Sequence, residues 1–205
     1  AEKMREVPSR GSLVAQAVNR GHPVISKGRT APGMFALLAT RYMKEYGATE
    51  EALGAVAMKN HYHGSLNPKA HFQKEITAEQ HARAPKVAEP LGLFDCCPTT
   101  DGAAAAILTR ADLAPKFTDN YTIIRGIAYA VTAGYWNTQF DQSWNFTSFR
   151  STREAAKGAY AMAGVTNPRK EIQVAECHDC FTITEIVNYE DLGLAEPGTG
   201  WRYAT

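Results

Sequence analysis

The apolar positions of residues 33–84 recur at three- and four-residue spacing, which is typical of helices. They predict one helix that ends before Gly47, a residue suited to a left-handed C-cap. Thr49, followed by two glutamates, is typical of a helix N-terminus and predicts a second helix that runs to about His63. A capping box that opens at Thr77 predicts a short third helix. This part of the chain is therefore expected to be mostly helical.

Beyond Pro90 the pattern changes to short apolar runs of strand length. Residues 91–98 form one such run, which ends at Pro98, and residues 172–176 form another. Residues 121–129 are rich in β-branched and aromatic side chains and predict a strand buried on both faces. The alanine-rich run 103–108 has helical propensity but only the length of a strand, so its pattern leaves both types open.

Two further helices complete the pattern. A capping box that opens at Ser151 and a stop at Gly164 predict a helix between them, and helical spacing returns over residues 183–192. The aromatic run 135–149 has no clear period and is expected to pack against a bulky apolar substrate or a partner surface. The alternation of strand, helix, strand, turn and helix predicts an α/β layered domain.

The composition narrows the classes of function. Of the 205 residues 44% are hydrophobic, which is ordinary for a globular protein. Lys and Arg number 22 against 21 Asp and Glu, so no excess charge attracts nucleic acid or an anionic membrane surface. No apolar run approaches the roughly 20 residues of a membrane span, and the N-terminus lacks the layout of a signal peptide. We therefore expect a cytoplasmic protein with no nucleic acid and no membrane partner.

The turn between the predicted strand 172–176 and the helix after it concentrates the candidate chemistry. His178 stands in this turn, where open α/β sheets bind ligands and a helix N-terminus adds free N–H donors. Its imidazole could donate a hydrogen bond to a developing thioester oxyanion, orient a water or move a proton. A purely structural role, in which His178 ties the strand end to the helix, is the alternative.

The four cysteines offer competing chemistries. Cys177 and Cys180 have the spacing of a zinc or thiol–disulfide pair, but tetrahedral zinc needs about four well-spaced ligands and the other two thiols are adjacent. Cys96 or Cys97 could attack a thioester as a nucleophile. Nearby aspartates raise a thiol's pKa, which favours a place in a pocket wall or in the core instead. We expect free thiols and no bound metal.

Several longer motifs follow one another along almost the whole chain. They are Glu2-Lys3-Met4, Ala31-Pro32-Gly33-Met34-Phe35, Lys44-Glu45-Tyr46-Gly47, Lys59-Asn60-His61, Asn67-Pro68, the run from Cys96 to Leu108, His178-Asp179-Cys180-Phe181 and Tyr189-Glu190-Asp191-Leu192-Gly193-Leu194. In this order they resemble the thiolase family, and specifically its sterol-carrier-protein branch.

The resemblance implies two similar α/β halves that sandwich buried helices, a thiolase-like layered α-β-α-β-α fold that is incomplete in this chain. By analogy, residues 1–118 are the end of the N-terminal half. They include a mostly helical inserted loop region, about 15–90, which covers the acyl pocket and coenzyme A. Residues 119–205 are the start of the C-terminal half. The resemblance also implies that residues 103–108 form a strand.

The resemblance further implies roles for five residues. In most thiolases the equivalent turn reads Asn-Glu-Ala-Phe and its Asn holds a catalytic water at the oxyanion site, a position that His178 takes here. Tyr189 lies on a helix that would bring it close to the pocket, as in branch members that are retro-aldolases and use tyrosines. Met34 is expected in the acyl pocket, Cys97 beside the pantetheine arm, and Phe181 among the substrate-binding residues.

The implied activity is that of an acyl-CoA C-acyltransferase. It would form or cleave a carbon–carbon bond of a coenzyme A thioester in lipid, steroid or aromatic-acid breakdown, without a cofactor. A retro-aldolase of steroid side-chain thioesters, bound to a small zinc-ribbon/OB-fold protein, is one alternative. A non-catalytic acyl-CoA or lipid-binding module is another. A homodimer or a mixed assembly is expected by analogy.

The family's nucleophilic cysteine and its Gly-His-Pro histidine have no counterpart among these residues. The cysteine lies just before the Glu-Lys-Met segment in the family, and the histidine and a second active-site cysteine lie beyond the equivalent of Thr205. We therefore expect an internal piece that has no thiolase activity alone and whose strands lack partners.

Overall fold

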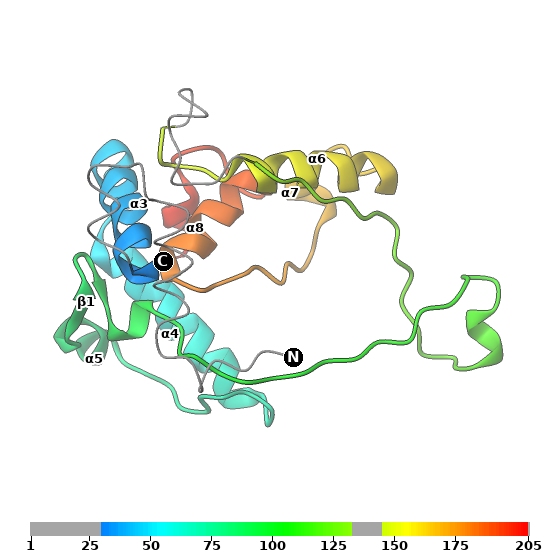
Figure 1. The fold of residues 1–205 in the computed structure, drawn as a ribbon, viewed down its shortest axis with the longest axis horizontal. Coiled ribbons are helices and arrows are strands. Elements are labelled where there is room, and N and C mark those ends of the chain that lie inside the picture. The colour runs from blue at the N-terminus through cyan, green and yellow to red at the C-terminus, as the bar shows by residue number, and fades with distance from the viewer. Residues whose placement is uncertain (1–29, 133–144, 205) are drawn as a thin grey trace.

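The computed structural model describes residues 30–132 and 145–204 (Figure 1). The motif at residues 2–4 and residues 135–144 of the aromatic run lie outside the described residues. The helices are α3 (Ala31–Tyr46), α4 (Glu50–Leu66), α5 (Ala78–Arg83), α6 (Arg150–Ala163), α7 (Pro168–Glu171) and α8 (Thr182–Asp191). Strands β1 (Lys86–Ala88) and β2 (Leu91–Gly92) pair antiparallel. Three 3₁₀-helices are η1 (Leu93–Asp95), η2 (Ala114–Lys116) and η3 (Gly200–Tyr203).

The first two helices lie where the apolar spacing predicted them. α3 begins after Thr30, whose hydroxyl accepts a hydrogen bond from the Gly33 N–H at 3.2 Å. It ends at Gly47, which has a φ of 70°, as expected for a left-handed cap. α4 begins after Thr49 and continues to Leu66, although the Thr49 hydroxyl makes no capping bond. In the described part of the chain, no helix has the length and apolar character needed to cross a membrane.

One of the two predicted capping boxes is present, and the prediction of the other is wrong. Thr77 and Gln80 exchange side chain-to-backbone hydrogen bonds of 2.8 and 3.2 Å at the start of α5. α6 begins one residue before Ser151, so no box forms there. The N–H of its N-cap residue, Phe149, donates to the Asp191 carboxylate at 2.5 Å. A carboxylate at the end of α8 thus replaces the local partner that the sequence predicted.

Helices α3, α4 and α8 enclose the hydrophobic core. Phe181, just before α8, stacks on Phe35 of α3 with ring centroids 4.4 Å apart. Burial of a large apolar side chain stabilises a fold by about 1.5–3 kcal/mol, so this core holds α8 against both α3 and α4. The largest fully buried side chains are Tyr42, Leu38, Leu53, Leu91, Ile183, Ile186, Val56 and Val187.

Three expected strands, at residues 103–108, 121–129 and 172–176, are extended but unpaired in the described part of the chain (Figure 1). The strand predictions for these residues are therefore wrong. Apolar and β-branched side chains favour an extended backbone. A strand forms only where a second segment supplies partners for its N–H and C=O groups.

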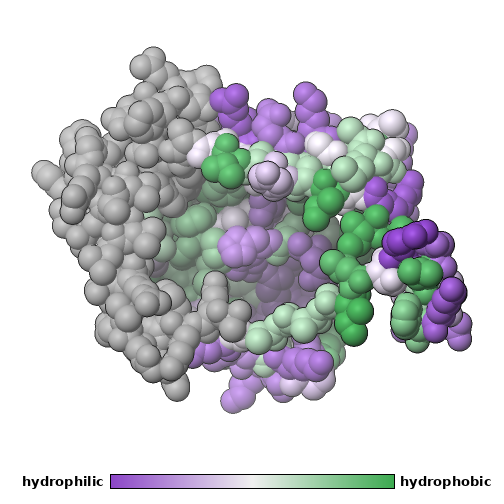
Figure 2. All heavy atoms as spheres, turned by 45° about the vertical axis from the view of Figure 1, so that its right-hand side comes forward, coloured by the Kyte–Doolittle hydropathy of each residue, from purple (hydrophilic) through white to green (hydrophobic). Residues whose placement is uncertain are grey.

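Segment 121–129 also lacks the burial that was predicted for both of its faces. Ile127 is 70% exposed and Tyr129 is 91% exposed. Hydrophobic side chains accordingly lie at the surface on the right of Figure 2. The segment runs along α6, so closely that a Cβ on Gly126 would lie 2.2 Å from the carbonyl oxygen of Ala159. One helix covers only one side of an extended chain.

The strand predicted over residues 91–98 is also shorter than expected. Only Leu91–Gly92 pairs with β1, after which the chain turns into η1. The Asp95 carboxylate accepts the Gly92 N–H at 2.8 Å and so closes this turn. A side-chain acceptor here competes with continuation of the strand.

Candidate functional site around the turn before helix α8

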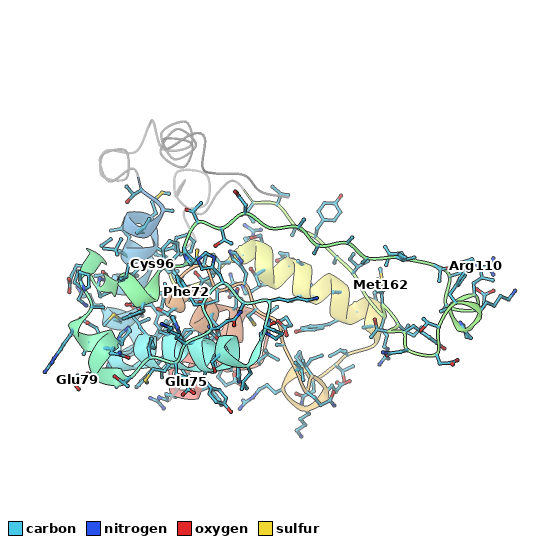
Figure 3. The ribbon with its side chains drawn as sticks, turned by 90° about the horizontal axis from the view of Figure 1, so that it is seen from below. Phe72, Glu75, Glu79, Cys96, Arg110 and Met162 are labelled. Carbon is cyan, nitrogen blue, oxygen red and sulfur yellow. The ribbon has the colours of Figure 1, made fainter. Side chains whose placement is uncertain are left out.

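The turn at residues 177–181 lies where α8 begins, against the loop that follows η1. Phe181 is the N-cap residue of α8 and forms an isolated antiparallel bridge with Cys96. The Cys97 N–H donates to the carbonyl oxygen of Cys180 at 3.1 Å. These backbone contacts place Cys97 beside the turn and leave Cys96 among the helices (Figure 3).

A buried carboxylate fixes this loop to α8. Asp95 is 2% exposed, and its Oδ1 accepts a hydrogen bond from the Thr182 hydroxyl at 2.9 Å. The same oxygen lies 2.9 Å from Nε2 of His81 in α5. Because Thr182 is the first residue of α8, one carboxylate joins α5, η1 and the start of α8. The loop carrying the two adjacent cysteines is thereby held against the turn.

Asn60 of α4 joins two further carboxylates. Its Nδ2 donates to Asp179 Oδ2 at 2.5 Å and to Glu185 Oε2 at 2.7 Å. Asp179 belongs to the turn and Glu185 to α8, so one amide connects three parts of the molecule. The second oxygen of Asp179, Oδ1, is buried without a hydrogen-bond partner among the described residues.

The other oxygen of Glu185 is also occupied. Lys59, next to Asn60 on α4, forms an ion pair with Glu185 Oε1, and the Tyr189 hydroxyl donates to the same oxygen. Lys59 Nζ lies 3.3 Å from the Tyr189 hydroxyl. Burial, followed by the hydrogen bond to Glu185, raises the pKa of Tyr189. Tyr189 is therefore a neutral phenol at physiological pH.

The Asp179 carboxyl group titrates closer to neutrality than an ordinary aspartate. Burial and then the charge of Glu185 raise its pKa to about 6, against the opposing effects of Asn60, Lys59 and His178. One lysine faces two carboxylates in this cluster, so a proton on Asp179 relieves the excess negative charge.

The His178 side chain is exposed at the edge of this cluster. Its backbone carbonyl accepts a hydrogen bond from Asn188 Nδ2 of α8 at 3.1 Å. The backbone is thus held from α8 while the imidazole faces solvent. An imidazole on a fixed backbone can donate a hydrogen bond to a ligand atom without a large loss of freedom.

The four cysteines are free and are poorly suited to act as nucleophiles. Burial raises the pKa of Cys97, Cys177 and Cys180, and raises that of Cys96 to about 11. The charge of Asp179 adds to the rise at Cys97, in line with the expected effect of neighbouring acidic groups. Among residues 30–132 and 145–204, no group of three His, Cys, Asp or Glu side chains is arranged to hold a metal ion.

The five residues singled out from the sequence fall into two places. His178, Cys97 and Tyr189 lie at or beside the turn, on the loop and helix that border it. Met34 is buried in the first turn of α3, and Phe181 is buried in the core against α3. In this structure Phe181 packs the protein interior.

Sequence reasoning missed the residues that hold the turn in place. Lys59, Asn60 and Asp179 appeared only as parts of motifs, and Glu185 was not singled out. The Asn60–Asp179 contact joins residues 119 positions apart, so no local spacing could reveal it. The available signal was a Lys-Asn pair directly after the apolar run 55–58 of the helix.

Known protein families account for nearly the whole chain. The family described as thiolase, N-terminal domain, matches residues 2–112, and that described as thiolase C-terminal domain-like matches residues 132–205. The chain belongs to the thiolase family. An acetyl-CoA acetyltransferase of Methanothermobacter thermautotrophicus is 38% identical over 201 residues, which are 98% of this chain and 51% of that protein.

Two other comparisons refine the place within the thiolase family. Sterol carrier protein 2 of Gallus gallus is 30% identical over 203 residues, which are 93% of this chain and 37% of that protein. A solved structure titled Ltp2-ChsH2(DUF35) aldolase matches with a TM-score of 0.77 at 28% identity, over 100% of this chain and 51% of that chain. These findings confirm the resemblance to sterol-carrier-type thiolases and the α/β fold, of which the described residues form helices and a small sheet. The chain spans about half the length, or less, of these relatives.

Proposed function

We propose that the whole protein is a thiolase-like acyl-CoA C-acyltransferase, which forms or cleaves a carbon–carbon bond of a coenzyme A thioester. The family matches at residues 2–112 and 132–205 carry this proposal. Relatives named acetyl-CoA acetyltransferase and sterol carrier protein 2 support it. We also infer that residues 1–118 and 119–205 belong to different thiolase halves, which the separate positions of the two family matches support.

In this proposal His178 donates a hydrogen bond to the thioester oxygen. That oxygen gains negative charge as the carbonyl carbon is attacked, so a donor aimed at it stabilises the transition state more than the bound substrate. The exposed imidazole and the backbone bond from Asn188 support this role. We assign nucleophilic attack to a cysteine outside these residues, as the family resemblance implies, and the raised pKa values of Cys96 and Cys97 support this assignment.

The remaining predicted residues take supporting roles in this proposal. Tyr189 lies near the pocket as a neutral phenol whose hydroxyl donates to Glu185, and not as a phenolate base, because its pKa is raised. Cys97 borders the pantetheine arm as a neutral thiol, and its position beside the turn supports this. Met34 and Phe181 shape the wall behind the acyl group.

A related aldolase is the second candidate, favoured by the match to a structure titled as an aldolase with a DUF35 component. Such an enzyme would cleave a β-hydroxyacyl-CoA, with a steroid side chain as one possible acyl group, beside a small zinc-ribbon/OB-fold partner. The two reactions differ in their need for free coenzyme A. Thiolysis transfers an acyl group to its thiol, whereas a retro-aldol cleavage releases a carbonyl product and a shorter thioester without it. A homodimer is the alternative to this complex with a small zinc-ribbon/OB-fold partner.

The test uses the full-length protein with acetoacetyl-CoA, and with β-hydroxyacyl-CoA thioesters, each with and without free coenzyme A. We expect acetyl-CoA from acetoacetyl-CoA only when coenzyme A is present. His178→Ala should lower kcat by about 10²–10³-fold, the usual effect of losing one oxyanion donor. His63→Ala, at an exposed position of α4, is the matched control and should retain the parent rate. An unchanged rate for His178→Ala would overturn the role proposed for this residue.

A further inference from the structure

We propose that Asn60 is a positioning residue for His178, because its side-chain amide ties the turn that carries the imidazole to helices α4 and α8. The inference rests on the function proposed above. It assigns to Asn60 of α4 a supporting part in the arrangement around His178. Asn60 touches neither His178 nor a reacting atom in this proposal. It acts through Asp179, which directly follows His178 in the chain.

The Asn60 amide suits this task because its nitrogen carries two hydrogens. Asp179 Oδ2 at 2.5 Å and Glu185 Oε2 at 2.7 Å each take one of them, which fixes the plane of the amide. A lysine or arginine could also bridge two carboxylates, but it would add charge beside the imidazole. The neutral amide holds both carboxylates and leaves their charge in place.

Glu185 provides a rigid anchor for this bridge. Its side chain is 6% exposed, and Lys59 and Tyr189 hold its second oxygen from α4 and from the next turn of α8. Both helices are fixed in turn by the apolar core, in which Val56 and Ile186 are fully buried. The position of Asn60 relative to α8 is therefore determined by packing as well as by hydrogen bonds.

Two ties at consecutive residues then set the direction of the imidazole. Asn188 holds the carbonyl of His178 from α8, and Asn60 holds the side chain of Asp179 from α4. Without Asn60, the half-buried Asp179 carboxylate would face Glu185 with both of its oxygens unpaired among the described residues. A proton on Asp179 would relieve that repulsion but would not restore the tie to α4, so the turn would be free to move outward, and the imidazole would move with it.

The first experiment measures the turn directly, by hydrogen–deuterium exchange of the full-length protein. Asn60→Ala should accelerate amide exchange in residues 177–181 while the core of α3 exchanges at the parent rate. Asn60→Gln, which keeps two N–H donors on a longer arm, should restore part of the protection. Asn120→Ala, at an exposed position, is the matched control. Unchanged exchange in residues 177–181 of Asn60→Ala would overturn the proposal whatever the activity of the protein.

The second experiment asks whether Asn60 acts through His178, by a double-mutant cycle on acyl-CoA turnover. Asn60→Ala alone should lower kcat about tenfold to a hundredfold with little change in KM, which is the scale for a misplaced catalytic group. In the His178→Ala background the same substitution should have almost no further effect. Equal losses in both backgrounds would overturn the positioning role and leave the proposed function intact. An unchanged rate for His178→Ala alone would instead refute the catalytic role of His178.

Discussion

The helical core and the extended segments contain similar side chains but differ in what surrounds them. Ile186 in α8 is 0% exposed, whereas Ile127 in the extended segment 121–129 is 70% exposed. In Figure 3, Cys96 lies among the packed helices and Arg110 lies at the far end of the extended part. Whether an isoleucine is buried thus depends on the segments that surround it. In the core, α3, α4 and α8 pack together and bury Ile186.

Carboxylates show the same contrast as isoleucines. Asp95 is buried and serves three hydrogen-bonding groups from three elements of the core. Asp112, in the extended part, makes an exposed ion pair with Arg110 two residues away, at 2.8 Å. The first carboxylate organises distant segments, whereas the second has only a local partner.

The largest expected difference between the two regions is in matched isoleucine truncations. Ile186→Ala should lower the free energy of unfolding by about 2–5 kcal/mol, because it leaves a cavity in the core. Ile127→Ala should change it by less than about 0.5 kcal/mol, as for an exposed site. Urea denaturation of the full-length protein measures both. Equal losses would show that segment 121–129 is covered in the whole protein.

Removal of the Asp95 carboxylate should have the next largest effect. Asp95→Ala leaves three buried donors without an acceptor, so we expect a loss of about 3 kcal/mol in the free energy of unfolding. Asp112→Ala removes an exposed ion pair and should cost less than about 1 kcal/mol. The same denaturation experiment compares them. A small loss for Asp95→Ala would mean that water replaces the carboxylate at little cost.

The raised pKa of Asp191 predicts that the free energy of unfolding depends on pH through a group in the core. Burial raises its pKa to about 7, although the Phe149 N–H and Arg153 oppose the rise. The folded state therefore binds the Asp191 proton more tightly than the unfolded state does. The stability that this proton contributes is fully present below a pH of about 4 and is lost as the pH rises through about 7. Asp191→Asn keeps an acceptor and removes the titration, and should be more stable than the parent by about 3 kcal/mol at pH 8, somewhat less than the full shift because an amide accepts the Phe149 N–H more weakly than a carboxylate.

The measurement for Asp191→Asn is the denaturation midpoint between pH 4 and pH 8. Its advantage over the parent protein should grow across this interval and level off near pH 7. Asp112→Asn, at the exposed ion pair, is the matched control and should not reproduce the trend. An advantage independent of pH would contradict the proposed titration.

The smallest predicted difference concerns two glycines that have equal space around them. A Cβ on Gly47 or on Gly102 would meet nothing within 4 Å, but only Gly47 has a positive φ, of 70°. Gly47→Ala should therefore cost about 1 kcal/mol in the free energy of unfolding, from backbone strain alone. Gly102→Ala should be neutral within about 0.5 kcal/mol. Thermal denaturation of the two variants tests this, and similar losses would exclude a backbone origin.

The fold predictions succeeded where the determining contacts are local. The Gly47 cap, the Thr77 capping box and the helix over residues 182–191 all depend on residues within one or two turns. They failed at segment 121–129, where residue type favours an extended backbone but only a partner strand can complete it. They also failed at Ser151, because Asp191 from another helix supplies the acceptor.

The candidate site divides in the same way. His178 was predicted as a site residue from its place in a turn after an apolar run, together with the family motif around it. Asn60 and Glu185 were not identified, since each is an ordinary polar residue in a helix until the helices pack. The roles proposed for them rest on hydrogen bonds that span more than a hundred positions of the chain.

The sequence by itself therefore determined five of the six described α-helices, the glycine ends of two of them, the family and the turn that carries His178. Backbone conformation and short motifs depend on neighbouring residues, which any single sequence displays. Only the tertiary structure decided which carboxylates are buried, which apolar runs remain exposed, and that Asn60 reaches the turn. Burial and pairing are set by segments distant in the chain, and these meet only when the core of α3, α4 and α8 forms.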